Sequence, residues 1–310
     1  MRIARKAELV MGSAQLGLIY GAANRTGKPV REAALRLIRR AADAGISTFD
    51  TARAYGDAED RLGEALAERP AVRTITKLAP LNELAPDASR QDVLAAVDAS
   101  LEQSRCALRR SSLDCLLLHR AHHITAYGGA VWDRVNEYLA SGAIATLGVS
   151  VQSPVEAHEA LAQPSVTHVQ LPFNMLDWRW REAGVIAALQ SRPEVTVHAR
   201  SVFLQGVLAA NDPGVWPPVP GVDALALITW LHECVCSFRR DCAADLALAY
   251  ARGQSWIDGV VIGQETEYQL DDNVRLCTRP PLTPEDCARI EASAPRVPEK
   301  LLDPAQWPPR

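Results

Sequence analysis

Short apolar runs alternate along the chain with longer stretches in which apolar residues recur every three or four positions. Residues 113–118 form one such run, nearly continuous in apolar side chains, as is typical of a parallel strand covered on both faces. Residues 30–44 show the other pattern, with helical spacing of Ala34, Leu35, Ile38, Ala41 and Ala42. Gly45 follows directly and predicts the end of that helix. The two patterns together predict strands that alternate with helices.

The same alternation continues through the rest of the chain. With their trailing loops, strands are predicted at 10–17, 45–50, 73–80, 113–119, 145–150, 166–174, 195–206 and 257–262. Helices are predicted at 30–44, 59–68, 89–108, 131–139 and 181–190, over 225–251 with a break near 239–241, and after starts at 153, 266 and 283. Ser or Thr followed three residues later by Glu, Asp or Gln marks several of these starts. The proline-rich tail 298–310 is predicted to be irregular.

Eight strands, each followed by a helical pattern and with no composition break that would mark a linker, predict a single domain over residues 1–310. Such alternation over about 250 to 300 residues is typical of an α/β fold of the (β/α)8 TIM-barrel type, here with a few extra helices. The competing fold, a doubly wound open sheet, normally carries a G-x-G-x-x-G turn after its first strand, and none is present.

Composition narrows the class of protein. The 310 residues are 48% hydrophobic and 23% charged with a net charge of -4, which is ordinary for a globular protein and gives no support for nucleic-acid binding. No run of about 18 apolar residues predicts a membrane span. The basic start Met1–Lys6 lacks a following apolar region, so we predict no signal peptide and a cytoplasmic protein. The seven scattered cysteines predict buried thiols rather than disulfides.

Polar side chains stand at the ends of three consecutive predicted strands. Asp50 ends the second strand, and Tyr55 follows in its loop. Lys77 ends the third strand and His119 the fourth. In a barrel of this kind the carboxyl ends of the strands face the active site. Each residue alone has an ordinary structural explanation, as a cap, a solvated lysine or a strand-end histidine, but their common position predicts a joint site.

Proton donation to a carbonyl oxygen would give these residues a common purpose. A free tyrosine has a pKa of about 10, which is too high for efficient proton exchange near neutral pH. A neighbouring ammonium group stabilises the phenolate, and Lys77 is predicted to do so for Tyr55. Asp50 would hold Lys77 by an ion pair, and a neutral His119 would orient the substrate oxygen. Hydride would have to come from a cofactor, because no side chain supplies it.

These residues also carry a resemblance to a known family. The segment Asp50-Thr51-Ala52-x-x-Tyr55-Gly56-x-x-Glu59-x-x-Leu62-Gly63 resembles the second-strand signature of the aldo-keto reductases, and the likeness extends from about Leu9 to Asn273. Lys77 and His119 resemble the remaining tetrad positions. The resemblance implies that Tyr55 is the general acid/base, assisted by Lys77 and Asp50, and that His119 orients the substrate. It further implies NAD(P)H-dependent reduction of an aldehyde or ketone to an alcohol.

The resemblance implies a cofactor site as well. Ser150 and Gln170 fall where family members hold the nicotinamide carboxamide, and Arg200 falls where an aromatic residue often stacks on the ring, as a guanidinium plane also can. The remaining assignments are Gly12 and Ser13 at the end of the first strand, Ser201, Phe203 and Gly206 in the pyrophosphate loop, and Ile262, Gly263, Gln264, Glu265, Gln269 and Asn273 at the adenosine end. There the helix capped at Thr266 would offer N–H groups to an anion.

Two positions depart from the family pattern. Val151 stands where asparagine usually follows Gly-Val-Ser, so one carboxamide contact is missing or replaced. Glu265 stands where many relatives carry arginine or lysine, and Gln269 adds no charge. A carboxylate is unfavourable near a 2′-phosphate, whereas it accepts hydrogen bonds from a free ribose diol. The family implies NADPH, and these residues leave NADH as the alternative.

Several alternatives remain open at this point. His119 with His122 and His123 is a weak candidate for a metal site, as is the set His232, Cys234, Cys236 and Cys242, and we predict no metal. The candidates for the substrate-pocket wall are Trp178, Trp180 and Trp216, the last favoured by its long loop 211–222. The barrel could instead bind a dinucleotide as a sensor, or use Tyr55 in non-redox chemistry. The expected partner is a small carbonyl compound; its identity and the oligomeric state do not follow from the sequence.

Overall fold

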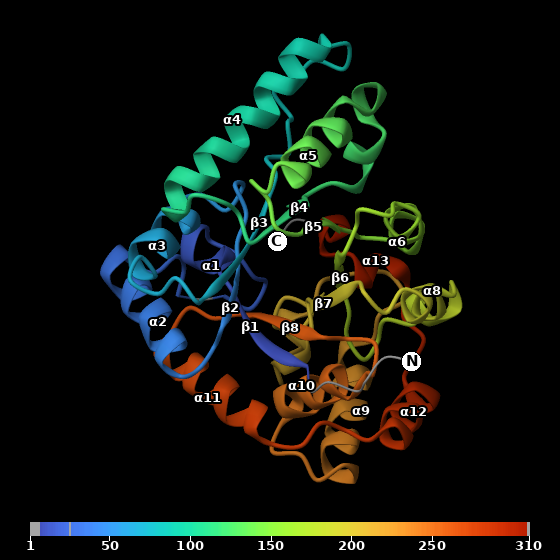
Figure 1. Ribbon diagram of the computed structural model, residues 1–310. Coiled ribbons are helices and arrows are strands. Elements are labelled where there is room, and N and C mark those ends of the chain that lie inside the picture. The colour runs from blue at the N-terminus through green and yellow to red at the C-terminus, as the bar shows by residue number, and fades with distance from the viewer. Residues whose placement is uncertain (1–6, 25, 309–310) are drawn as a thin grey trace.

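The fold is a closed barrel of eight parallel strands in chain order, with β8 hydrogen-bonded to β1 (Figure 1). The computed structural model describes residues 7–24 and 26–308. The strands are β1 (Glu8–Gly12), β2 (Thr48–Asp50), β3 (Arg73–Lys77), β4 (Cys115–Leu118), β5 (Leu147–Ser150), β6 (His168–Pro172), β7 (Thr196–Arg200) and β8 (Gly259–Gly263). The predicted (β/α)8 architecture is confirmed. The expectation about Met1–Lys6 concerns a segment outside the described residues.

The register of the barrel brings the predicted site residues to one rim. Gly12, at the end of β1, pairs with Asp50 of β2 on one side and with Gly263 of β8 on the other. Lys77 is the last residue of β3. Because all strands run parallel, these ends share the carboxyl face of the barrel, where the loops of a (β/α)8 fold build active sites.

Helices surround the barrel and connect its strands. The longer ones are α2 (Arg31–Asp43), α3 (Ala58–Ala65), α4 (Arg90–Leu108), α5 (Ala130–Ala140), α6 (Pro154–Leu161), α8 (Val185–Ser191), α9 (Ala224–Ser237), α10 (Ala243–Gly253), α11 (Glu267–Thr278) and α12 (Pro284–Ser293). The predicted break near 239–241 separates α9 from α10. The predicted caps are confirmed, because a backbone N–H three residues on donates to the side chains of Ser89, Ser153, Thr266 and Thr283.

Three predicted elements differ from the structure. The first strand ends at Gly12, and residues 14–17 form the helical turn α1 (Ala14–Gly17). The helix predicted at 181–190 consists of two short pieces, α7 (Arg179–Glu182) and α8. The tail contains α13 (Glu299–Leu302), in which Leu301 and Leu302 are buried. Elements of four residues are shorter than the window over which hydrophobic periodicity can be read.

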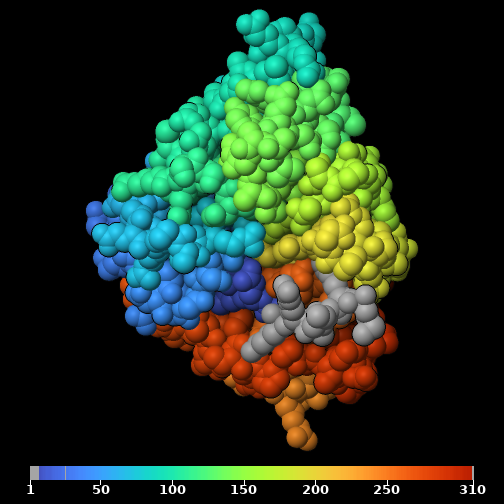
Figure 2. Space-filling model, viewed as in Figure 1, coloured from blue at the N-terminus to red at the C-terminus, as the bar shows by residue number. Residues whose placement is uncertain are grey.

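Helices α4 and α5 project from one side of the barrel (Figure 1) and form the upper lobe of the surface in Figure 2. The two helices are joined by polar contacts. Arg134 of α5 donates to both carboxylate oxygens of Asp98 in α4, at 2.7 and 2.9 Å, and the Tyr138 hydroxyl donates to the same carboxylate at 2.7 Å. This bidentate geometry fixes the lobe more firmly than a single surface ion pair would.

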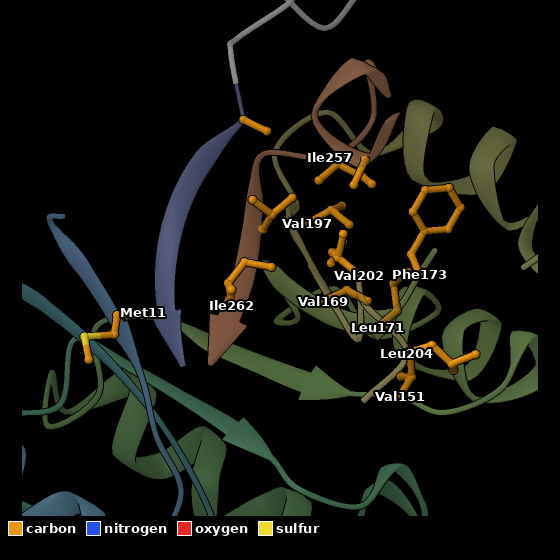
Figure 3. Close-up of a cluster of buried hydrophobic side chains, with 14 of the residues drawn as sticks. Met11, Val151, Val169, Leu171, Phe173, Val197, Val202, Leu204, Ile257 and Ile262 are labelled. Atoms are coloured by element: carbon orange, nitrogen blue, oxygen red, sulfur yellow. The ribbon is translucent and has the colours of Figure 1, made fainter. Parts of the chain in front are cut away.

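The two faces of the barrel wall differ in polarity. Side chains such as Leu171 of β6, Val197 of β7 and Ile262 of β8 belong to the large apolar cluster that joins strands and helices (Figure 3). Alternate residues point the other way, into the barrel. There the rings of His168 and His198 meet edge to face, with centroids 4.4 Å apart, and Cys115 Sγ lies 3.7 Å from His168 Nδ1. The barrel interior therefore holds buried polar groups.

The cysteine prediction is only partly correct. The seven cysteines, all within the described residues, form no disulfide. Cys115, Cys234 and Cys287 are buried, but Cys106, Cys236 and Cys242 are exposed, so the expectation of buried thiols is wrong for those three. Across residues 7–24 and 26–308, no group of three or more His, Cys, Asp or Glu side chains is arranged to hold a metal ion. None of the helices in these residues is both long enough and apolar enough to cross a membrane.

Candidate active site

A buried ion pair lies at the centre of the predicted site. Lys77 Nζ donates to both carboxylate oxygens of Asp50 and to the carbonyl oxygen of Thr51, each at 2.8 Å. The side chains of Lys77 and Asp50 are 1% and 4% exposed. Burial alone would lower the pKa of Lys77, but the Asp50 carboxylate outweighs it and raises that pKa. Lys77 is therefore held as a cation, and its three protons are all used within the protein.

The predicted proton donor lies directly beside this pair. Lys77 Nζ is 5.1 Å from the centroid of the Tyr55 ring. The His119 ring meets the Tyr55 ring edge to face, with centroids 5.8 Å apart. Burial, followed by the positive charges of Lys77, Arg120 and Arg200, lowers the pKa of His119 to about 3. His119 is therefore neutral near pH 7, and its buried Nδ1 has no protein partner among the described residues.

The loop that carries Tyr55 is set by two glycines in close contact. A Cβ atom on Gly17 of α1 would lie 1.8 Å from the Tyr55 carbonyl oxygen, and one on Gly56 would lie 2.5 Å from the Gly17 carbonyl oxygen. Gly56 also has a φ of +56°, which a side chain disfavours. The β2 loop therefore rests directly on the turn after β1, and this contact fixes the height of Tyr55 over the barrel.

A buried carboxylate supports the same loop from below. Glu59 of α3 is fully buried; one of its oxygens accepts a hydrogen bond from Thr76 Oγ1 at 2.5 Å, and the other pairs with Arg53. Thr76 precedes Lys77 on β3, and Arg53 precedes Tyr55 in the loop. Glu59 therefore ties the tyrosine loop to the lysine strand. The sequence showed Glu59 only as part of a motif, with no physical role.

A cavity of about 410 Å³ opens in front of Tyr55 and extends to the start of α11. It joins the two halves of the predicted site. The predicted residues that line it are Gly12, Ser13, Asp50, Tyr55, Arg200, Ser201, Phe203, Gly206, Ile262, Gly263, Glu265, Gln269 and Asn273. Lys77 and His119 are not in the lining, since Lys77 is fully buried and acts from behind Tyr55.

Three predicted cofactor residues do not line this cavity: Ser150, Gln170 and Gln264. Gln170 is fully buried and donates to Asp50 Oδ2 at 2.7 Å, so it extends the ion-pair network. Its Oε1 has no partner, and Ser13 Oγ and Gln264 Nε2 are likewise buried without one in the described residues. Buried polar atoms normally form hydrogen bonds, so the unpaired Ser13 Oγ, whose residue lines the cavity, is open to a ligand with a complementary group.

The loop after β7 has an unusual backbone. Ser201, Leu204 and Gln205 have φ values of +60°, +45° and +57°, followed by Gly206 at +91°. Such conformations cost about 1 to 3 kcal/mol each and cluster at functional sites. In the described residues, the backbone N–H groups of Val202, Phe203 and Gln205 have no acceptor. Consecutive free N–H groups in a left-handed turn form a concave surface that suits an anion.

The far end of the cavity is acidic. Glu265 and Asp272 both line it there, together with Tyr268, Gln269 and Asn273. Asp272 is paired with Arg275 at 2.8 Å, and Arg275 is held in turn by Asp241. The Gln269 amide oxygen accepts from the backbone N–H groups of Glu265 and Thr266, so the predicted anion site at this helix start is partly occupied by the capping box.

Several lining residues were not predicted. The largest group comes from the segment after β1, namely Ala14, Gln15, Tyr20, Gly21, Ala23 and Asn24. This segment reaches the β7 loop, because Ala23 N–H donates to the Gln205 carbonyl at 3.2 Å. The only sequence indication was Tyr20 beside Gly21 in an irregular stretch, which gives no periodicity to read. The others, from later in the chain, are Val202, Gln205, Ala209, Ala210, Ala244, Val261, Tyr268 and Asp272.

The tryptophan candidates do not line the cavity. Trp180 is fully buried and donates to Asp177 at 3.0 Å, and Trp216 is 5% exposed within the apolar cluster. Trp178 donates to the Val297 carbonyl and packs under Arg296. The long loop 211–222 folds back onto the core, so its predicted binding role is not supported by its position. The burial of Trp216 in the apolar core, rather than the length of its loop, therefore determines where this loop lies.

Comparisons with known proteins show the family of the chain and agree with its fold. The family model of the aldo/keto reductases matches residues 8–295. A curated relative, the 6-dehydroglucose reductase of Novosphingobium aromaticivorans, is 35% identical over 129 residues, which span 38% of this chain and 41% of that protein's length. Among solved structures, an aldo-keto reductase from Bacillus halodurans in its holo form is similar with a TM-score of 0.74 at 21% identity, covering 94% of this chain and 93% of that one. Its apo form gives a TM-score of 0.69 at 21% identity, covering 91% and 92%.

Proposed function

The chain belongs to the aldo/keto reductase family and is an oxidoreductase, and from that membership we propose that it reduces an aldehyde or ketone to an alcohol with Tyr55 as the proton donor. The observation that carries the proposal is that Tyr55, which lines the cavity, lies beside both the fixed Lys77 cation and the neutral ring of His119. The positive charge of Lys77 stabilises the phenolate that remains when Tyr55 gives its proton to the carbonyl oxygen.

The other members of the set act through position and charge. Asp50 holds Lys77 in place and keeps it charged. His119 is neutral, so it can donate a hydrogen bond to the substrate oxygen without adding a second positive charge. Gln170 fixes the Asp50 carboxylate from the opposite side. Preorganised groups of this kind need no rearrangement as charge develops on the oxygen, which is the main source of electrostatic catalysis.

We propose that the cavity holds a nicotinamide dinucleotide. When bound, that cofactor supplies the hydride that the carbonyl carbon accepts. The unpaired Ser13 Oγ, whose residue lines the cavity, suits an amide head group near Tyr55, and the free N–H groups at Val202 and Phe203 suit a pyrophosphate. The adenosine would then occupy the end of the cavity near α11, beside Tyr268, Gln269 and Asn273.

The charge at that far end supports NADH over NADPH. Among the described lining residues, Glu265 and Asp272 are the charged side chains at that end, and Arg200, which carries the positive charge, belongs to the Tyr55 end. Because Asp272 is already paired with Arg275, the repulsion falls on Glu265: a 2′-phosphate would bring two further negative charges towards its carboxylate, whereas a ribose diol could donate hydrogen bonds to it. We therefore propose NADH as the preferred cofactor, in contrast to the NADPH that the family resemblance implied.

The test begins with binding. Titration of the purified protein with NADH and with NADPH, followed by energy transfer from tryptophan to the reduced nicotinamide, should show saturable binding of at least one. Reduction of a panel of aldehydes and ketones is then followed by loss of the reduced cofactor. Binding without turnover of any carbonyl compound would favour the sensor alternative, and binding of neither cofactor would refute the proposal.

The Tyr55→Phe variant separates chemistry from binding. Removal of the hydroxyl takes away the proton donor, so kcat should fall by at least about 100-fold, which is the lower range for general acid catalysis. The dissociation constant of the cofactor should change little, because the ring and its packing are kept. Equal losses of cofactor binding and turnover would contradict the assigned role of Tyr55.

A further inference from the structure

Arg200, at the end of β7, is a half-buried cation without an acidic partner. It lines the cavity on the same side as Tyr55. Its Nη2 atom donates to the Gln152 side-chain oxygen at 2.7 Å and to the Val151 carbonyl at 3.2 Å, and Nη1 lies 3.5 Å from Ser201 Oγ. All three acceptors are neutral, and within residues 7–24 and 26–308 the guanidinium forms no ion pair.

The charges around the catalytic end therefore do not cancel. Asp50 is fully engaged with Lys77 and Gln170. Arg200 lies close enough to these groups that its charge lowers the pKa of His119 and opposes the rise in the pKa of Lys77. The acidic lining residues Glu265 and Asp272 belong to the opposite end of the cavity. One positive charge is left beside the place where the carbonyl group would bind.

A guanidinium that is partly removed from water is stabilised by an anionic partner, which offsets its lost hydration. Its planar set of donors matches a carboxylate in two parallel hydrogen bonds. In Arg200, Nη2 is held by Val151 and Gln152, while Nε has no acceptor and Nη1 has only a long contact in the described residues. The free donors remain available to a ligand in the cavity.

A pyrophosphate has its own donors further along the chain. Val202, Phe203 and Gln205 offer backbone N–H groups on the loop that follows Arg200. Arg200 precedes that loop and lies instead with Tyr55, Lys77 and His119. We propose that the carbonyl substrate carries a carboxylate, and that Arg200 binds it while Tyr55 protonates the carbonyl oxygen. This inference rests on the proposed reductase function.

Gln152 sets the position of Arg200. Its side-chain oxygen accepts from Arg200, and its Nε2 donates to Asp303 Oδ1 at 3.1 Å in the C-terminal tail. The neutral amide of Gln152 thus separates the Arg200 guanidinium from the Asp303 carboxylate. A glutamine here orients the guanidinium without neutralising it, which a glutamate would do. Gln152 is therefore a positioning residue for substrate charge.

The test compares two aldehydes of the same shape, 4-formylbenzoate and 4-formylbenzamide, which differ in charge. The wild-type protein should prefer the carboxylate in kcat/KM. Arg200→Gln should lower kcat/KM for 4-formylbenzoate about 10- to 100-fold more than it lowers kcat/KM for 4-formylbenzamide, which is the range for a charge-assisted hydrogen bond. Arg200→Lys keeps the charge but loses the planar geometry. Its kcat/KM for 4-formylbenzoate should therefore lie between the values for the wild type and for Arg200→Gln.

Two further variants keep the result interpretable. Arg39→Gln removes an exposed arginine of α2 and should leave the selectivity unchanged, which controls for net charge. The exchange Gln152→Glu with Asp303→Asn moves a carboxylate next to Arg200 and retains the hydrogen bond between positions 152 and 303. It should abolish the preference for 4-formylbenzoate while Arg200 itself is intact, and its circular dichroism should match the wild type.

Binding is measured separately from turnover. Calorimetric titration with 4-(hydroxymethyl)benzoate and its amide, in the presence of the nicotinamide cofactor, should show carboxylate binding that Arg200→Gln weakens at least about 10-fold. If the wild-type protein binds the carboxylate but reduces neither aldehyde, the reductase function is refuted while the anion site remains. Equal affinity of the wild type for both ligands would overturn the inference, as would an Arg200→Gln effect confined to cofactor affinity.

Discussion

Lys77 and Asp50 form a buried ion pair, in which each buried charge is compensated only by the charge of the other residue. Taking either charge out of water is costly, and the pair offsets this through close contact and the added bonds to Thr51 and Gln170. The same arrangement that supports Tyr55 is therefore also a stability element. In the proposed mechanism, catalysis and folding therefore depend on the same two side chains.

Asp50→Asn should consequently destabilise the protein as well as inactivate it. An uncompensated buried ammonium costs about 3 to 5 kcal/mol, which urea denaturation would measure as a lower midpoint. The double variant Asp50→Asn with Lys77→Met removes both charges and should recover most of that stability while activity stays lost. A double variant no more stable than Asp50→Asn would show that the ion pair is not the source of the loss.

Glu265 is the residue on which cofactor choice is expected to depend. Glu265→Arg replaces a carboxylate at the far end of the cavity by a cation that can bind a 2′-phosphate. The ratio of NADH to NADPH affinity should shift towards NADPH by about 10-fold or more in fluorescence titrations. Glu267→Arg makes the same charge change two residues away, outside the cavity lining, and should shift the ratio much less. Equal shifts in both variants would indicate a general charge effect.

At the scale of elements, the turn α1 and the β2 loop form one unit through Gly17 and Gly56. Gly17→Ala would place a methyl group 1.8 Å from the Tyr55 carbonyl oxygen, so the tyrosine loop must move. Overpacking of this kind costs about 1 to 3 kcal/mol, and a displacement of about 1 Å at a reacting group can reduce the rate by about 100-fold.

We expect kcat to fall by that amount in Gly17→Ala while the cofactor affinity changes less, because Tyr55 moves relative to the cavity. Steady-state kinetics and cofactor titration together test this. Gly214→Ala serves as a matched control, since its Cβ would meet only the Asp212 side chain, at 3.1 Å. Unchanged kinetics in Gly17→Ala would mean that the loop accommodates the methyl group without moving Tyr55.

How far the sequence predicts these elements depends on their length. All eight strands, the long helices and the caps at Ser89 and Thr266 follow from periodicity and local hydrogen bonding, and they bring Asp50, Tyr55 and Lys77 together. The segment around Tyr20, which lines the cavity without regular structure, does not follow, because its position depends on contact with the β7 loop. The burial of Trp216 likewise depends on tertiary packing.

At the scale of the whole molecule, two buried histidines are expected to make the stability of the fold depend on pH. Burial, followed by neighbouring positive groups, lowers the pKa of His198 to about 3, and His168 is shifted in the same direction by burial and by His198. An unfolded histidine titrates near about 6.5. The unfolded chain therefore binds more protons than the folded one below that pH, and the stability present above pH 6.5 is lost as the pH falls.

Between pH 7.5 and pH 5.5, each of these two histidines should lower the free energy of unfolding by about 1.4 kcal/mol. Urea denaturation should therefore show that the free energy of unfolding falls by about 3 kcal/mol because of the pair. Replacement of both by glutamine should flatten this part of the pH dependence, whatever its effect on stability at pH 7.5. His232→Gln alters an exposed histidine and should leave the slope unchanged. An undiminished slope in the double variant would assign the acid sensitivity to other groups.

The pairing of β8 with β1 has a consequence for how the chain is made. Glu8 and Gly259 are partners in the register, so the barrel closes only after about 250 further residues have left the ribosome. At about 5 to 20 residues per second, translation of that stretch takes roughly 12 to 50 s. Throughout that time one edge of β1 stays open, and the nascent chain depends on whatever shields it until its last strand arrives.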